Sequence, residues 1–419
     1  MTSYLVIGTM RGRRWPARLL GIMVALASAL RPSVTLVAQQ HTERVVRGMG
    51  SDPARATELV ILGVDHSAQL VARAYHPGYL RAFFDRVQPA AICIERAPDE
   101  FARGDFYEFT YEQQYVAVPY ARAHGIEICP VDWLPSRDDE RLAFGRMEVV
   151  DPPAVRQPNG FQGFLAMDST SLRRTLFYAD SEPTRGETRA FFDAPRAAGW
   201  RDFPRRLDLY RTFMQAMRIR AAARAHPGQR VLVVVGSMHK DDLEHVLAGD
   251  PAIHLVQPST FGLPDSSQAD AQLAAEDLAA IASFNLLGAQ PTEGPIDWAW
   301  VAAALDRFER LRGTTSPEVR LLRTRYAVLT RSLSAANAAA AYERIAQDAD
   351  SAARFTFTGV QDTRRVDSYY DPFGNLTIRQ RAQLETAREW VRAGHADAAR
   401  RVGAQLKRDA HWSALGSAE

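Results

Sequence analysis

The feature that most constrains the fold is an alternation, between residues 58 and 256, of short apolar runs with longer segments of helical periodicity. Five runs have the length and composition of strands: residues 59–62, 90–94, 126–131, 230–235 and 253–256. Apolar residues recur at helical spacing between them, over residues 77–87, 111–123, 205–225 and 241–247. This alternation predicts an α/β fold with a mostly parallel sheet and helices on both faces.

The pattern is interrupted once and then ends. Residues 134–204 are rich in Pro, Gly, Arg and Asp with weak periodicity, which predicts a lid-like insertion in an α/β domain spanning residues 55–263. Residues 264–419 are rich in Ala, Leu and Arg without strand signals, and so predict a C-terminal all-α domain. Helices are expected near residues 271–287, 297–312, 317–333, 336–350, 378–393 and 396–407, with 355–370 the least helical stretch.

The N-terminus has the pattern of a secretory signal. Four arginines, the last of them Arg18, precede an apolar run over residues 19–30, and small residues follow it. We expect a signal peptide over residues 1–38, cleaved after Ala29 or Ala38. The run is shorter than the about 20 residues that span a bilayer, although a retained anchor is the alternative. The expected location is periplasmic or extracellular, with membrane contact only through this signal.

Charge and cysteine content narrow the class of protein further. The 51 basic and 49 acidic residues leave a net charge of +2, which argues against nucleic acid as the main partner. Two cysteines cannot staple a chain of 419 residues, so a hydrophobic core must stabilise it. Cys93 and Cys129 fall at matching depths of two predicted strands, and we expect both to be small core residues. The alternative is a single disulfide between them, which an oxidising compartment would allow.

Polar residues follow four of the predicted strands. His66, Glu95, Asp132 and His239 come after them in chain order, and both histidines close a Gly-x-x-His sequence. Ligands of parallel sheets bind beyond the carboxyl ends of the strands, so these side chains are expected at one edge. Two imidazoles with carboxylates suit a divalent metal, or His66 acts as a general base. A surface or capping role is the alternative for each histidine alone.

Glu95 and Arg211 complete the candidate set. A glutamate directly after an apolar strand lies at the rim of the core, where an unpaired carboxylate is costly. It therefore either pairs with an arginine or takes part in the chemistry. Arg211, on the helix before the fourth strand, is a candidate for stabilising an oxyanion or binding a substrate carboxylate, with a surface role as the alternative. Glu112 faces either this edge or solvent.

These motifs resemble the TraB/GumN/Tiki superfamily, which is related to the erythromycin-esterase and ChaN-like proteins. The resemblance rests on the paired Gly-x-x-His motifs, Glu95 between them and the helix that bears Arg211. It covers residues 58–256 apart from the insertion. The sequence departs from the family pattern at Asp65, where small or hydroxyl residues are common, and at Thr212, where an acidic or amide residue is usual.

The resemblance implies a cleft at the strand ends of two βα-rich halves. Tiki members are metal-dependent peptidases that rely on both histidines and a glutamate, which correspond to His66, His239 and Glu95. The expected function is therefore a metal-dependent hydrolase, peptidase- or esterase-like, that acts on a small molecule or peptide with a divalent metal of open identity. ChaN-like members bind haem, so a haem or small-ligand binding protein is one alternative. A catalytically inactive interaction protein is another.

Overall fold

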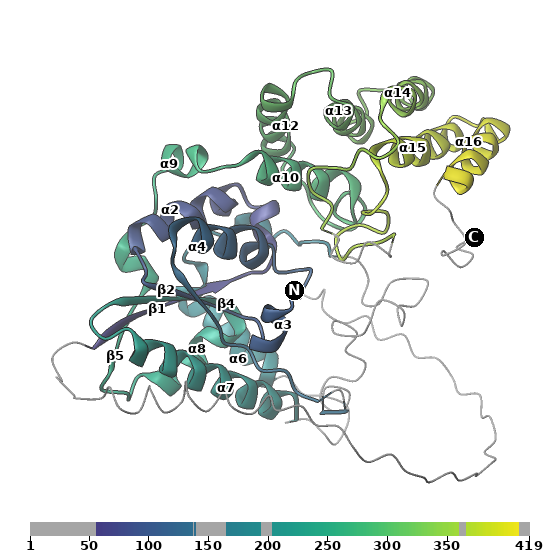
Figure 1. The fold of residues 1–419 in the computed structure, drawn as a ribbon. Helices are drawn as coiled ribbons and strands as arrows, with labels where there is room; N and C mark the ends of the chain where they lie inside the picture. The colour runs from purple at the N-terminus through teal and green to yellow at the C-terminus, as the bar shows by residue number, and fades with distance from the viewer. Residues whose placement is uncertain (1–55, 137, 140–164, 194–202, 360–365, 410–419) are drawn as a thin grey trace, which may run out of the picture. The chain divides into compact units, whose positions relative to one another are not determined.

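The computed structural model describes the chain from residue 56 to residue 409 with four gaps (Figure 1). The described residues are 56–136, 138–139, 165–193, 203–359 and 366–409. The described residues belong to one compact unit. The predicted signal peptide lies outside the described residues, as do residues 140–164 and 194–202 of the predicted insertion. No helix in the described ranges is both long and apolar enough to cross a membrane.

The centre of the molecule is a five-stranded sheet in which all strands are parallel. The strands are β1 (Thr57–Val64), β2 (Ala91–Ile94), β3 (Glu127–Pro130), β4 (Arg230–Gly236) and β5 (Ile253–Val256). They lie in the order β3-β2-β4-β1-β5. All five predicted strands are confirmed. The central strands β1, β2 and β4 are almost completely buried, as expected in a parallel sheet covered on both faces, whereas the edge strands β3 and β5 are only partly buried.

Helices cover both faces of this sheet (Figure 1). On one face α2 (Pro77–Val87) and α4 (Val118–His124) pack on alternate strand residues such as Val60 and Leu232. On the other face α7 (Phe203–Ala225) and α8 (Ser237–Leu247) pack on the intervening residues, including Ile61 and Val233. Burying each such side chain stabilises the fold by about 1.5–3 kcal/mol. The predicted α/β class is confirmed.

The two cysteines are bonded to each other. Cys93 of β2 and Cys129 of β3 are register partners in neighbouring parallel strands, and a disulfide joins them on the face covered by α7. Cys93 is completely buried, as the core interpretation requires, and the alternative of a disulfide is the one that the structure contains. The bond ties together the two strands that precede Glu95 and Asp132.

The described part of the predicted insertion is more regular than its composition suggests. It contains the turns η5 (Ser171–Arg173) and η6 (Tyr178–Asp180), followed by the helix α6 (Glu182–Asp193). This helix is stabilised from outside its own sequence, because Arg185 pairs with Asp241 and Glu244 of α8 at 2.7 and 2.8 Å. Such tertiary ion pairs leave no periodic signal in the segment itself.

The C-terminal part of the described chain is helical, as predicted. Its helices are α9 (Ser266–Ala271), α10 (Ala275–Leu287), α11 (Gln290–Glu293), α12 (Trp298–Arg312), α13 (Pro317–Leu329), α14 (Ala335–Asp348), α15 (Ile378–Arg392) and α16 (Ala396–Asp409). The helix expected over residues 271–287 begins later, as α10 at Ala275, because the Asp277 carboxylate accepts the Ala274 N–H at 2.8 Å.

Helix α10 joins the helical part to the α/β part. Almost every side chain along it is buried, as expected for a helix covered on all sides. Its Asn285 donates to the Leu70 carbonyl at 2.8 Å, and its Asp277 pairs with Arg81 of α2. On its other side α10 packs against α12 and α13. The two parts therefore share one continuous hydrophobic core.

Candidate functional site

The sequence-predicted residues meet at the carboxyl edge of the sheet. Strand β4 lies between β1 and β2, so His66, Glu95 and His239 follow three neighbouring strands. Asp132 follows β3, the next strand along. Because parallel strands end at the same edge, residues up to 173 positions apart become neighbours here.

Glu95 is the side chain that the others share. Its Oε1 lies 3.4 Å from His239 Nε2 and accepts a hydrogen bond of 2.8 Å from Arg211 Nη2. Its Oε2 lies 3.7 Å from His66 Nε2 and accepts the Gly236 backbone N–H at 2.6 Å. Glu95 is 4% exposed, so its charge is compensated by these groups rather than by solvent.

Each imidazole is oriented through its other nitrogen. His66 Nδ1 lies 2.8 Å from Glu112 Oε1, and His239 Nδ1 lies 2.8 Å from the Thr212 hydroxyl oxygen. Since a carboxylate only accepts, His66 Nδ1 carries the proton and donates it to Glu112. Both rings are thereby held with Nε2 directed at Glu95. A partner on Nδ1 that fixes ring orientation is the arrangement seen around metal-binding histidines.

Glu112 reaches His66 because its helix is locally widened. It lies in the π-helical turn η3 (Glu112–Ala117), which continues into α4. Pro119 has no N–H to give to the Tyr115 carbonyl, and Arg81 Nη2 donates to that carbonyl at 3.1 Å instead. π-helical turns of this kind are frequent at functional sites. Glu112 is completely buried, so of its two predicted orientations the structure shows the inward one.

One face of α7 supplies most of the remaining contacts. Asp208, Arg211, Thr212 and Gln215 lie at positions i, i+3, i+4 and i+7, which share a helix face. Arg211 donates through Nε and Nη2 to both oxygens of Asp132, at 2.9 and 2.7 Å. The first task of Arg211 is therefore to hold Glu95 and Asp132 in place.

Three residues of the site were not among the sequence-based candidates. Gln215 donates to Asp132 Oδ1 at 2.8 Å, the Tyr107 hydroxyl donates to Asp132 Oδ2 at 2.9 Å, and Asp208 Oδ1 lies 3.7 Å from His239 Nδ1. The helical spacing from Arg211 would have found Asp208 and Gln215. No local signal marks Tyr107, whose partner is 25 residues away.

Neighbouring charges together shift the pKa values of His66, His239 and Glu95 more than burial does. Burial opposes protonation of His66, but the neighbouring Glu112 carboxylate raises the pKa of His66 to about 9. Burial likewise opposes protonation of His239, and Glu95 raises its pKa. Burial would raise the pKa of Glu95, yet His239 and Arg211 together lower it well below its usual range. The carboxylates of the site therefore favour the protonated, positively charged form of both imidazoles.

The two motif glycines are needed for different close approaches. A Cβ on Gly236 would lie 2.9 Å from His66 Nε2 and 3.2 Å from Glu95 Oε2, inside the site. A Cβ on Gly63 would instead lie 2.8 Å from the Ala179 Cβ, against the η6 turn. Neither glycine has a positive φ, so the requirement at both is space rather than backbone conformation.

Two neighbours of the motifs have structural contacts elsewhere. Asp65 Oδ2 accepts from Ser171 Oγ at 3.1 Å and Arg174 Nε at 3.2 Å, which fastens η5 to the first motif. Asp65 thus has its partners in the predicted insertion. Lys240 is 1% exposed and donates to the Ile61 carbonyl and to Glu244, at 2.6 and 2.7 Å. It stabilises the junction of α8 with the sheet.

The donor set fits a divalent cation in type. Two imidazole nitrogens and one carboxylate are ligands that zinc and related ions take, and the Nδ1 partners already orient both rings. As placed, no group of three or more His, Cys, Asp or Glu side chains in the described chain could hold a metal ion. At this site both oxygens of Glu95 accept hydrogen bonds, from Arg211 and from the Gly236 N–H.

The comparisons with known proteins do not place the chain. No protein-family model, no curated protein and no solved structure matches it. The argument for function therefore rests on the geometry of the site.

Proposed function

We propose that this chain is a metal-dependent hydrolase, peptidase- or esterase-like, that works at the carboxyl edge of the sheet. One observation carries the proposal: two imidazoles, each oriented through Nδ1 by its own partner, direct Nε2 at a single buried carboxylate. Such convergence of acid–base and ligand groups from separate strands is typical of active sites rather than of packing. It also agrees with the resemblance to the TraB/GumN/Tiki superfamily.

We propose His66, His239 and Glu95 as the residues that would hold the metal. The contacts between Glu95 and the two Nε2 atoms, at 3.7 and 3.4 Å, are bridged either by protons on the imidazoles or by a cation. The anionic surroundings that favour protonated imidazoles favour a cation for the same reason, so metal uptake should release protons. A bound divalent ion would lower the pKa of a water molecule and polarise a carbonyl group.

The chain's own residues hold this site in order. Arg211 fixes the position of Glu95 and, through Asp132, the ends of β2 and β3. Glu112 and Thr212 keep the two rings from rotating. His66, with 22% of its side chain exposed, is the more accessible of the two imidazoles, and His239 has 6%. As the alternative to ligating the metal, His66 is therefore the imidazole placed to exchange a proton with a substrate.

The experiment is a screen of peptide and ester substrates with the purified protein and added Zn²⁺, Mn²⁺ or Co²⁺. We expect turnover with one of these ions and a loss of at least about 100-fold in Glu95→Gln, His66→Asn and His239→Asn. The matched control is Glu276→Gln, an exposed carboxylate on α10, which should retain full turnover. Turnover that persists in all three site variants would overturn the proposal.

The same variants separate the two alternatives. A haem titration that shifts the Soret band in wild type, and not in His66→Asn or His239→Asn, would favour a haem-binding protein of the ChaN-like kind. An interaction protein cannot be tested by deleting residues 264–419, because α10 is part of the core that supports α2 and η1 (Ala68–Leu70). Binding of a partner protein that the site variants leave unchanged would favour that alternative.

We also infer export of the protein to the periplasm or the extracellular medium. The Cys93–Cys129 disulfide supports this, since such bonds persist in oxidising compartments. Mass spectrometry of the mature protein should find a chain that begins after Ala29 or Ala38. A full-length chain with free thiols would contradict export.

A further inference from the structure

The turn that carries His66 is held by a residue from the far end of the chain. Ser67, next to His66, has a φ of 62°, the left-handed region that side-chain-bearing residues seldom adopt. Its hydroxyl donates to the Phe109 carbonyl at 2.6 Å and lies 3.0 Å from the Tyr370 hydroxyl. Since the Ser67 hydrogen is given to Phe109, Tyr370 donates to Ser67 Oγ. The Ser67 backbone N–H faces Glu112 Oε2 at 3.4 Å.

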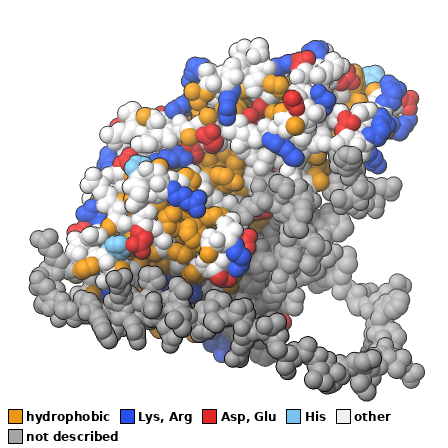
Figure 2. Space-filling view, viewed as in Figure 1, with side chains coloured by type: hydrophobic (Ala, Val, Ile, Leu, Met, Phe, Trp, Pro, Cys, Tyr) orange, Lys and Arg blue, Asp and Glu red, His pale blue; other side chains and the backbone are white. Residues whose placement is uncertain are grey.

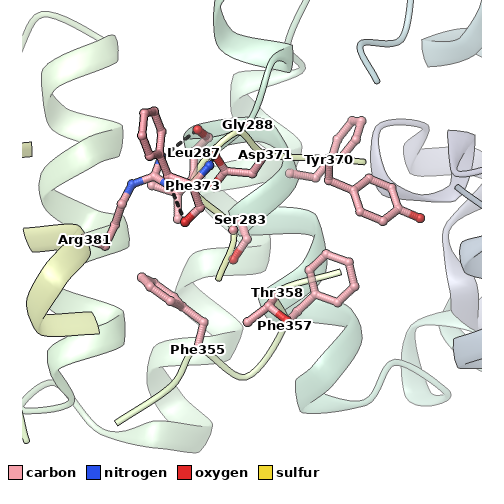
Figure 3. Close-up of a pocket in the computed structure, with 12 residues that line it drawn as sticks. Ser283, Leu287, Gly288, Phe355, Phe357, Thr358, Tyr370, Asp371, Phe373 and Arg381 are labelled. Carbon is pink, nitrogen blue, oxygen red and sulfur yellow. Dashed lines mark hydrogen bonds and ion pairs between the residues drawn. The ribbon is translucent and has the colours of Figure 1, made fainter. Parts of the chain in front are cut away.

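Tyr370 is placed for this bond by the helical part of the chain. It is 2% exposed, and a Cβ on Gly288 or on Gly359 would collide with it. The next residue, Asp371, pairs at 2.5 Å with the buried Arg381, which also donates to the Leu287 carbonyl. Figure 3 shows the Tyr370 hydroxyl pointing away from these partners and from the small hollow of about 20 Å³ that its ring borders.

Tyr369, the residue before Tyr370, contacts the segment that carries Glu108 and Phe109. The Tyr369 N–H donates to Glu108 Oε2 at 2.8 Å, and the Tyr369 ring lies 5.4 Å from the ring of Phe109. Phe109 in turn meets His66 edge-on, with centroids 5.3 Å apart. Two adjacent residues of the C-terminal part thus contact both loops that flank the His66 ring.

We propose that Tyr370 is a positioning residue of the active site. Its hydroxyl keeps Ser67 in the left-handed turn and so sets His66 between Glu112 and Glu95. The helical part of the chain thereby completes a site whose other side chains all come from the α/β part. This inference rests on the proposed function, because it assigns Tyr370 to that site.

The test compares two tyrosine-to-phenylalanine variants by NMR of protein with ¹⁵N-labelled histidine. Tyr370→Phe removes only the hydroxyl that reaches Ser67. The matched control is Tyr342→Phe on α14, because Tyr342 is also completely buried and its hydroxyl has no hydrogen-bond partner in the described structure. The His66 ring signals are assigned from their absence in His66→Asn.

We expect Tyr370→Phe to shift or broaden the His66 ring signals while the far-ultraviolet circular dichroism stays unchanged. Tyr342→Phe should leave the His66 signals where they are in wild type. Ser67→Ala removes this link together with the hydrogen bond from Ser67 to Phe109, so its effect should be at least as large as that of Tyr370→Phe, and the double variant should add nothing beyond Ser67→Ala. If Tyr370→Phe does not fold, unchanged His66 signals in Ser67→Ala overturn the proposal.

Unchanged His66 signals in the folded Tyr370→Phe or Ser67→Ala protein would overturn the proposal. This readout needs neither metal nor turnover, so it separates the two failures. Absence of hydrolysis from every metal-loaded sample would remove the proposed function and leave the positioning of His66 by Tyr370 standing. A hydrolase with an undisturbed His66 in Tyr370→Phe would remove the positioning alone.

Discussion

The two Gly-x-x-His motifs place their histidines next to the same carboxylate, that of Glu95, with different backbone conformations. After Gly63 the chain leaves β1 in a loop, with left-handed Ser67 directly after His66. After Gly236 the chain enters α8 at once, and His239 lies in its first turn. The Gly-x-x-His spacing that the two motifs share therefore indicates only that each histidine lies just past the end of a strand. Ring orientation comes from separate partners, a carboxylate for His66 and a hydroxyl for His239.

The largest effect is expected from removing what the two motifs share. Glu95→Gln deletes the charge that both imidazoles and Arg211 face, and leaves the buried His239 without its nearest carboxylate. We expect the free energy of unfolding at pH 7 to fall by about 3–5 kcal/mol, measured by urea denaturation. The exposed control Glu276→Gln should change it by no more than about 0.5 kcal/mol. A fall below about 1 kcal/mol in Glu95→Gln would mean that the two histidines do not depend on Glu95.

The second prediction concerns the Nδ1 partners that distinguish the motifs. Glu112→Gln should weaken Zn²⁺ binding by about 10–100-fold, because a carboxylate both orients His66 and increases its basicity. Thr212→Val should weaken it less, by up to about 10-fold, because a hydroxyl contributes orientation without charge. Isothermal titration calorimetry gives both values. If Thr212→Val weakens Zn²⁺ binding as much as Glu112→Gln does, or more, the charge of the Nδ1 partner is irrelevant to the site.

The third prediction uses the motif glycines. Gly236→Ala should disturb the contacts of His66 and Glu95, reducing Zn²⁺ affinity, since the added Cβ enters the site. Gly63→Ala should instead lower the free energy of unfolding by about 1–3 kcal/mol through overpacking against Ala179, with a smaller effect on Zn²⁺. Parallel calorimetric and urea measurements on both variants check this. Identical profiles would contradict the distinction between the two motifs.

His76 differs from the two motif histidines, because there burial shifts the pKa more than the neighbouring carboxylate does. It is 2% exposed and stacks on Trp300 at 5.3 Å; burial lowers its pKa to about 4 although Asp270 lies 3.1 Å away. The unfolded chain protonates His76 near pH 6.5 and the folded chain only near pH 4. Stability is therefore full above pH 6.5 and falls as the pH drops toward 4.

The expected loss at His76 is on the order of 1–2 kcal/mol by pH 5. Urea denaturation between pH 7 and pH 5 should show a shallower pH dependence in His76→Gln than in wild type. The same slope in both proteins would exclude His76 as its source.

The sheet and the candidate residues could be predicted because their signals are local. Each strand is an apolar run, and His66, Glu95 and His239 each follow one of them. The orienting partners could not be predicted in the same way. Glu112 depends on a π-helical turn, and Tyr370 reaches Ser67 across 303 residues. Such contacts are set by packing of the whole chain, which no short window of sequence records.

The most direct test of the account is a Zn²⁺ titration of the purified, metal-stripped protein beside its His66→Asn, His239→Asn and Glu95→Gln variants. The account predicts about one equivalent bound by wild type, with protons released on binding, and loss of that equivalent in each of the three variants. Wild-type protein that binds no Zn²⁺, Mn²⁺ or Co²⁺, or variants that bind as wild type does, would contradict it.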